Sequence, residues 1–184
     1  MNSVTGIILA AGGSSRMGHP KALLDLDGAP LIRHHINQFS RVCDRIVVVT
    51  GRHRAEIEAV LPPEVVAIHN PSWHQTGPAE SLLLALREPS TRAVVTPVDV
   101  PPVPSAVLDA LLAVSGAAVP QWQGRDGHPV VIDRRARAVL AAGGVLRDAL
   151  VDAQRVAVEW PDATANLNRP EQWSAWLRAR DQRR

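Results

Sequence analysis

The sequence has little cysteine, little net charge and no long hydrophobic run. Cys43 is its only cysteine, which excludes an internal disulfide and a metal site made of several cysteines, and fits a reducing cytoplasm. A formal net charge of +2 provides no basic groove for nucleic acid, so no nucleic-acid partner is expected. The apolar run at residues 7–11 is too short for a signal-peptide core, and no stretch approaches a membrane span. We expect a cytoplasmic protein with no membrane partner.

What the sequence does contain is typical of one folded globular domain. Hydrophobic residues make up 46% of it and charged residues 21%, and the charges are interspersed rather than grouped, which argues against disorder. A chain of 184 residues can bury roughly two-thirds of its unfolded surface and needs no cross-link to fold. We therefore expect a single domain over residues 1–184.

Apolar runs and amphipathic segments alternate along the first half of the chain. Short apolar runs predict buried strands at residues 4–10, 45–50, 65–68 and 93–98. Apolar residues at three- and four-residue steps, together with proline stops, predict helices at about residues 31–39, 55–61 and 79–88. This alternation predicts an α/β fold, in which a doubly wound, mostly parallel sheet carries helices on both faces.

The second half continues the pattern less regularly. We expect helices at about 105–114, 135–141 and 170–180, and strands at 117–120, 128–132 and 155–159. The Asp-Gly dipeptide at 126–127 is a typical hairpin turn. In sheets of this kind ligands bind beyond the carboxyl ends of the strands, so functional residues are expected in the loops after Ala10, Thr50, Ile68 and Val98.

The loop after the first predicted strand has the composition of a phosphate-binding site. Gly12 and Gly13 are followed by Ser14, Ser15 and Arg16. Glycines allow backbone N–H groups to approach phosphate oxygens, and a nearby cation neutralises their charge. An ordinary glycine-rich turn is the alternative. The spacing excludes a Walker A loop and the dinucleotide-binding fingerprint.

Asp99 follows the strand predicted at residues 93–98, at the same edge of the sheet as the first loop. A carboxylate at this place suits Mg²⁺, which prefers oxygen ligands and commonly bridges a carboxylate to substrate phosphates. The alternative is a structural one, in which Asp99 caps the helix that follows.

Residues 9–24 read Leu-Ala-Ala-Gly-x-Ser-Ser-Arg-Met-Gly-x-Pro-Lys-x-Leu-Leu. This long pattern resembles the signature of the molybdenum-cofactor cytidylyl- and guanylyltransferases, which are MobA-like NTP transferases, and the resemblance extends from Gly6 to about Trp173. It implies a Rossmann-like nucleotidyltransferase fold of the nucleotide-diphospho-sugar transferase type. The nucleotide-binding half would be about 1–104 and the acceptor-binding half about 105–184.

The resemblance also implies an activity: magnesium-dependent transfer of a nucleoside monophosphate from a nucleoside triphosphate to a phosphorylated acceptor, molybdopterin, with release of pyrophosphate. It implies Arg16, Lys21 and Asp99 as catalytic residues, with Asp99 also as a ligand of the metal. The nucleotide-binding residues that it implies are Leu9, Ala10, Ala11, Gly12, Gly13, Ser14, Ser15, Gly77, Pro78 and Ser81.

The resemblance is less complete in the acceptor-binding half. Gly127, His128 and Pro129 are similar to a Gly-His-Pro segment of the cytidylyltransferases, and this resemblance implies acceptor binding. His128 taken alone would better fit the start of a strand. Asn168 stands where the family often has an aspartate, which puts a second metal carboxylate in doubt. Asn168 is therefore an optional second residue of the metal site, and it is also the expected cap of the last helix.

The base cannot be assigned from one motif. Residues 77–78 are similar to the guanylyltransferases, whereas Ser81, Leu82 and Ala11 are similar to the cytidylyltransferases, and together they favour CTP over GTP. Transfer to a sugar phosphate or alcohol phosphate, and a non-catalytic nucleotide-binding relative, remain as alternatives. A downstream molybdoenzyme or its chaperone is the further partner that the family implies.

Overall fold

The computed structural model describes residues 3–183. The main strands are β1 (Val4–Ala10), β4 (Arg45–Thr50), β5 (Val66–His69), β6 (Arg92–Pro97), β7 (Ala118–Trp122), β8 (Arg125–Asp126), β9 (Val130–Ile132) and β10 (Gln154–Ala157). The α-helices are α1 (Leu31–Phe39), α2 (Arg54–Glu58), α3 (Pro78–Ala85), α4 (Ser105–Ala113), α5 (Arg134–Ala141), α6 (Leu146–Ala149) and α7 (Pro170–Asp181). Two 3-10 helices, η1 (Lys21–Leu23) and η2 (Pro161–Thr164), and a small hairpin, β2 (Asp25–Leu26) with β3 (Ala29–Pro30), complete the elements.

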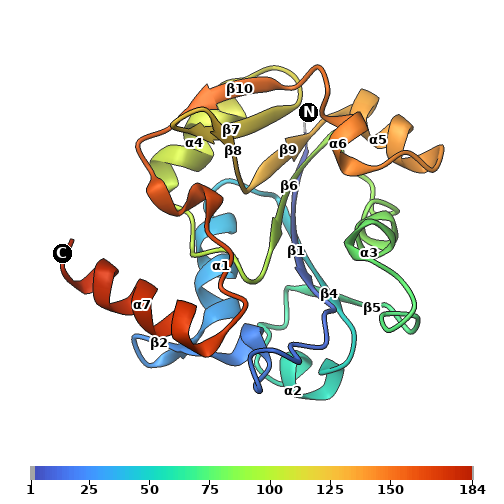
Figure 1. Ribbon diagram of the computed structural model, residues 1–184. Helices are drawn as coiled ribbons and strands as arrows, with labels where there is room; N and C mark the ends of the chain where they lie inside the picture. The colour runs from blue at the N-terminus through green and yellow to red at the C-terminus, as the bar shows by residue number, and fades with distance from the viewer. Residues whose placement is uncertain (1–2, 184) are drawn as a thin grey trace.

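One mixed sheet organises the fold (Figure 1). Its strand order is β10-β7-β9-β6-β1-β4-β5, and β8 pairs with β7 outside this path. The strands β6, β1, β4 and β5 run parallel to one another, whereas β9 runs antiparallel to both β6 and β7. The predicted doubly wound, mostly parallel sheet is therefore confirmed. Across residues 3–183, no helix combines the length and the apolar character that crossing a bilayer requires.

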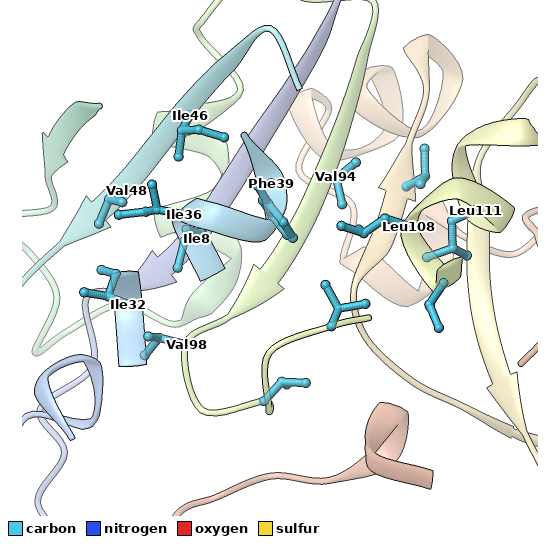
Figure 2. Packing of buried hydrophobic residues seen from close by; sticks show 14 of the residues in the cluster. Ile8, Ile32, Ile36, Phe39, Ile46, Val48, Val94, Val98, Leu108 and Leu111 are labelled. Carbon is cyan, nitrogen blue, oxygen red and sulfur yellow. The ribbon is translucent and has the colours of Figure 1, made fainter. Parts of the chain in front are cut away.

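Successive residues of β1 point to opposite faces of the sheet, and each face has its own hydrophobic core. Ile8 belongs to the cluster that includes Phe39 of α1 and Leu108 of α4 (Figure 2). Ile7 belongs to the other cluster, with Leu82 of α3 and Leu140 of α5. Figure 1 shows α1 and α4 on one side of β1, and α3 and α5 on the other. Burial on both faces explains why β1 is apolar along most of its length.

The predicted hairpin turn at Asp126-Gly127 is wrong. The chain turns between β7 and β8 at Gln123 and Gly124, which have φ angles of 47° and 76°. Two-residue hairpin turns favour positive φ at both positions, and glycine satisfies this at Gly124. Gly127 has another role: a Cβ there would lie 2.2 Å from the carbonyl oxygen of Ala163, so only glycine allows η2 to pack this closely.

His35 is a titratable side chain inside the core, with an exposed fraction of 1%. Burial lowers the pKa of His35 to about 4, and the backbone of Val98 and Val100 and the charge of Asp99 only partly oppose this effect. The ring is therefore neutral at pH 7 and packs beneath the loop that carries Asp99.

This burial predicts a loss of stability in acid. An unfolded histidine binds its proton near pH 6.5, whereas the folded ring binds it only near pH 4. The unfolded chain thus binds more protons between these values, and the free energy of unfolding falls by up to about 3 kcal/mol as the pH is lowered across this window. Urea unfolding of wild type and His35→Leu at several pH values checks this. The stability of His35→Leu should rise relative to that of wild type as the pH falls. A difference in the free energy of unfolding that does not change with pH would contradict the buried neutral ring.

Candidate functional site

The loop after β1 is held in shape by Ser14. Its carbonyl oxygen accepts hydrogen bonds from the N–H groups of Met17 (3.0 Å) and Gly18 (3.2 Å), and its side-chain oxygen accepts one from the N–H of Lys21 (3.2 Å). Ser14 itself has a φ angle of 49°. These contacts fold the loop back on itself, so that Lys21 begins η1 at the edge of the loop.

Three strand ends lie level at this edge of the sheet. Leu9 of β1 is opposite Val49 of β4 and Pro97 of β6, so the loops that follow must meet. Gly51 makes the meeting possible, since a Cβ at this position would lie 2.1 Å from the carbonyl oxygen of Ala11. The loops that follow these strands therefore adjoin at one edge of the sheet, which is the edge where the sequence predicts the ligand site.

The side chain of Lys21 is at the centre of this site. Its Nζ lies 2.8 Å from Oδ2 of Asp99 and 2.7 Å from Oδ1 of Asn168. The side chains of Lys21 and Asp99 are only 15% and 19% exposed, so the ion pair is largely shielded from water. The contact joins three segments that are far apart in the sequence, and we call it the Lys21 cluster.

Backbone hydrogen bonds bring the segment before α7 to the Lys21 cluster. The N–H of Leu167 donates to the carbonyl oxygen of Asp99 over 2.7 Å. Oε1 of Gln172 accepts from the N–H groups of Asn168 (2.9 Å) and Arg169 (3.0 Å). The prediction that Asn168 caps α7 is wrong: Arg169 stands at the cap position, and Gln172 binds the free backbone groups, which leaves the Asn168 side chain directed at Lys21. Figure 1 shows this red segment beside the blue first loop.

Two cavities adjoin the Lys21 cluster and share Gly12, Ser14 and Lys21 in their walls. The larger, of about 300 Å³, is mostly apolar and is lined by Leu9, Ala10, Gly12, Ser14, Pro20, Lys21, Ala22, His53, Ile57, Pro78, Pro97, Val98, Asp99 and Asn166. The smaller, of about 210 Å³, is lined by Gly12, Gly13, Ser14, Ser15, Arg16, Lys21 and Asn168. The larger cavity is an apolar slot, and the glycine-rich loop beside it carries the cationic side chains of Arg16 and Lys21. This arrangement suits a ligand that has one flat apolar part and one anionic part.

Most of the residues implied for nucleotide binding line one of these cavities, but three do not. Ala11 is buried next to Gly51, and its carbonyl oxygen accepts from the N–H of Arg52 over 3.4 Å. The N–H of Gly77 donates to Glu80 over 2.9 Å at the start of α3. Ser81 is 4% exposed and accepts a hydrogen bond from the side chain of Asn70 over 3.0 Å. Asn70 also donates to Thr76, so this network shapes the segment that places Pro78 in the larger cavity.

The residues implied for acceptor binding lie outside both cavities. The N–H of Gly127 donates to the carbonyl oxygen of Pro120 (2.9 Å), and that of His128 donates to Ala163 (2.8 Å). Burial lowers the pKa of His128, and the charge of Asp99 works in the opposite direction. His128 is thus close enough to Asp99 to sense its charge, on the side of the β7–β8 hairpin.

His53 and Arg52 lie at or beside the site but were not predicted from the sequence. His53 lines the larger cavity, where Nε2 lies 3.4 Å from the carbonyl oxygen of Gly13 and Nδ1 lies 3.1 Å from Glu56. The guanidinium of Arg52 stacks 5.9 Å from the centre of the Trp73 ring. The only sequence signal for His53 and Arg52 was their place in the loop after Thr50, which does not say which side chains face inward.

Comparison with known proteins gives consistent results. Residues 6–158 match the family model of the MobA-like NTP transferase domain. The molybdenum cofactor guanylyltransferase of Shewanella frigidimarina is 31% identical over 191 residues, which cover 92% of this chain and 93% of that protein. A molybdenum cofactor cytidylyltransferase of Escherichia coli is 29% identical over 139 residues, 73% of this chain and 72% of that protein. A probable molybdenum cofactor guanylyltransferase of Rhodopirellula baltica is 38% identical over 104 residues, about half of each chain (52% and 48%).

Solved structures support the fold. The crystal structure of Rv0371c from Mycobacterium tuberculosis superposes with a TM-score of 0.82 at 23% identity, and the alignment covers 96% of this chain and 98% of that one. The arrangement of strands and helices is therefore the nucleotide-diphospho-sugar transferase type predicted from the sequence.

The contact at Gly51 gives a test of the site. Gly51→Ala must push the loop after β4 away from Ala11, and it should weaken binding of a nucleoside triphosphate by about tenfold or more, because small displacements of positioning groups have large effects. Titration with a fluorescent CTP or GTP derivative measures this. Gly116→Ala is the matched control, since its Cβ would meet only Asp133, at 3.5 Å. Equal affinity of the two variants would mean that the loops need not approach this closely.

Proposed function

This chain belongs to the MobA-like NTP transferase family, and from that premise we propose that it uses magnesium to transfer a nucleoside monophosphate from CTP or GTP to molybdopterin. The chain is a nucleotidyltransferase of the molybdenum cofactor guanylyl- and cytidylyltransferase type. The nucleotide, the metal and the acceptor are the proposed parts.

The single observation that carries the proposal is the position of Lys21. Its ammonium lies in the wall common to the apolar cavity and to the glycine-rich cavity, within 2.8 Å of the Asp99 carboxylate. A nucleoside triphosphate with its base in the apolar cavity would direct its phosphates past this point. Arg16, which is exposed and lines the smaller cavity, would meet the far end of the same triphosphate.

Magnesium fits the residues present. Two oxygen atoms, one from Asp99 and one from Asn168, already converge on a single positive charge, the Lys21 ammonium. Oxygen donors that converge in this way are what a hard divalent cation requires. Asp99, with Asn168 beside it, would hold the ion, which when bound neutralises charge on phosphate oxygens.

The residues of the site then act by positioning and by charge. The acceptor is a phosphate monoester and is already anionic at neutral pH, so one of its oxygens can attack the α-phosphorus without a strong general base. The bond from the α-phosphorus to the bridging oxygen breaks, and pyrophosphate leaves with the electron pair. Lys21 and Arg16 stabilise the charge that develops on the leaving group, and the glycine-rich loop fixes the triphosphate for in-line attack.

The base and the acceptor are inferred from weaker signals. The proposal favours CTP over GTP because Ala11, Ser81 and Leu82 resemble the cytidylyltransferases. Ala11 and Ser81 line neither cavity, however, and most of the similar proteins are guanylyltransferases, so GTP is tested beside CTP. His128 lies near enough to Asp99 to sense its charge, so the acceptor would approach Asp99 from the side of His128. A molybdoenzyme or its chaperone would receive the product.

The direct test is release of pyrophosphate by the purified protein with magnesium and each of CTP, GTP, ATP and UTP, with and without molybdopterin. Release that depends on molybdopterin and on one nucleotide supports the proposal and identifies the base. Nucleotide binding without release would favour the non-catalytic alternative. Release with a sugar phosphate or an alcohol phosphate instead would reassign the acceptor.

Asp99 gives the sharpest substitution. Asp99→Asn keeps the shape of the side chain but removes its charge, and should lower kcat by about a hundredfold or more while circular dichroism still shows a folded protein. The matched control is Asp126→Asn. Asp126 lies on the β7–β8 hairpin, and its exposed carboxylate pairs with Arg155 of β10. Near-normal turnover of Asp99→Asn would refute the role assigned to this carboxylate.

A further inference from the structure

Lys21 is the only lysine in the sequence. The chain has 20 basic residues of the Lys and Arg types, and the other 19 are arginines. The two side chains differ in shape: the arginine guanidinium is a flat fork, whereas the lysine ammonium is a compact point charge with three donors. The one place where this chain has the compact cation is the centre of the site.

The geometry around Lys21 is that of a cation between oxygen ligands. Oδ2 of Asp99 and Oδ1 of Asn168 face the same nitrogen at 2.8 and 2.7 Å, from segments that a backbone hydrogen bond holds side by side. These are the same two oxygens that the proposed function assigns to magnesium. Two positive charges in contact with the same oxygens would repel each other strongly in a site this shielded from water.

We propose, building on the proposed function, that Lys21 is a displaceable counter-cation for the metal site. Without nucleotide, its ammonium occupies the place of the divalent ion between Asp99 and Asn168. A triphosphate supplies a new partner for Lys21 on the side of the glycine-rich loop, where this residue lines the smaller cavity. Once Lys21 has moved to the phosphates, both oxygens are free for the metal.

This exchange sets which ligand the site accepts. Free divalent metal must compete with an ammonium that the chain itself supplies, so it binds weakly. In the complex of metal and nucleotide, the metal replaces the Lys21 ammonium between Asp99 and Asn168, and the triphosphate becomes the new partner of Lys21. Metal and nucleotide therefore bind together. Coupling of this kind is reciprocal: nucleotide raises the affinity for metal by the same factor by which metal raises the affinity for nucleotide.

The first experiment measures binding of Mn²⁺ alone, in the absence of any nucleotide, by loss of its free electron paramagnetic resonance signal. Lys21→Met keeps an unbranched side chain of similar length without the charge, and should bind Mn²⁺ at least about tenfold more tightly than wild type. Adding Asp99→Asn to this variant should abolish the gain. Circular dichroism establishes that each variant is folded. Tight binding by wild type, or no gain in Lys21→Met, overturns the proposal.

The second experiment uses the single lysine as a reporter in the unaltered protein. Lysine labelled with ¹³C at Cε gives one side-chain NMR signal per chain, that of Lys21. Millimolar Mg²⁺ alone should leave this signal in place, and Mg²⁺ with the α,β-methylene analogue of CTP or GTP should shift it. A shift with Mg²⁺ alone, or none with both ligands, contradicts the exchange.

The two proposals can fail separately. If no pyrophosphate is released with any acceptor but Lys21→Met still gains affinity for Mn²⁺, then the counter-cation is correct and the transferase reaction is not. If pyrophosphate is released but Lys21→Met gains no affinity for Mn²⁺, the reaction stands and Lys21 does not occupy the metal position.

Discussion

The contact of Lys21 with Asp99 and Asn168 is the interaction on which the rest of the site depends. It joins the loop after β1, the loop after β6 and the segment before α7, and no two of these are close in the sequence. The ion pair of Lys21 and Asp99 is mostly shielded from water. Separating the two side chains without a new partner would therefore leave an unpaired charge in a cleft where water solvates it poorly. The site is therefore arranged around a charge balance that any ligand has to preserve.

The parallel centre of the sheet makes this contact possible. The ends of β1, β4 and β6 are level, so their loops must share one edge, and glycine is required where two of them touch, at Gly51. The second half of the chain meets the same edge through β9, which runs antiparallel beside β6, and through the N–H of Leu167, which donates to the carbonyl oxygen of Asp99. Backbone hydrogen bonds therefore join the two halves of the chain at this edge.

Prediction from sequence succeeded where the signal is local and periodic. The runs that form β1, β4 and α1 were predicted with their observed bounds, because a strand buried on both faces and a helix with one apolar face each have a distinct pattern. Prediction failed for β2 and β3, which have two residues each and therefore show no periodic pattern. It also failed for the turn after β7, because glutamine at position 123 gives no indication of the positive φ that it adopts.

For the site, the sequence by itself determined the loop at residues 9–24, the carboxylate at Asp99 and the family, since these depend on residue types at fixed spacing along the chain. Only the tertiary structure decided that Asn168 faces Lys21 rather than capping α7, that Ser81 is held by Asn70, and that His53 lines the larger cavity. The physical reason is that each of these depends on hydrogen bonds between separate segments. The packing of the whole chain decides which hydrogen-bond partner a polar side chain takes. A local sequence pattern contains no information about that packing.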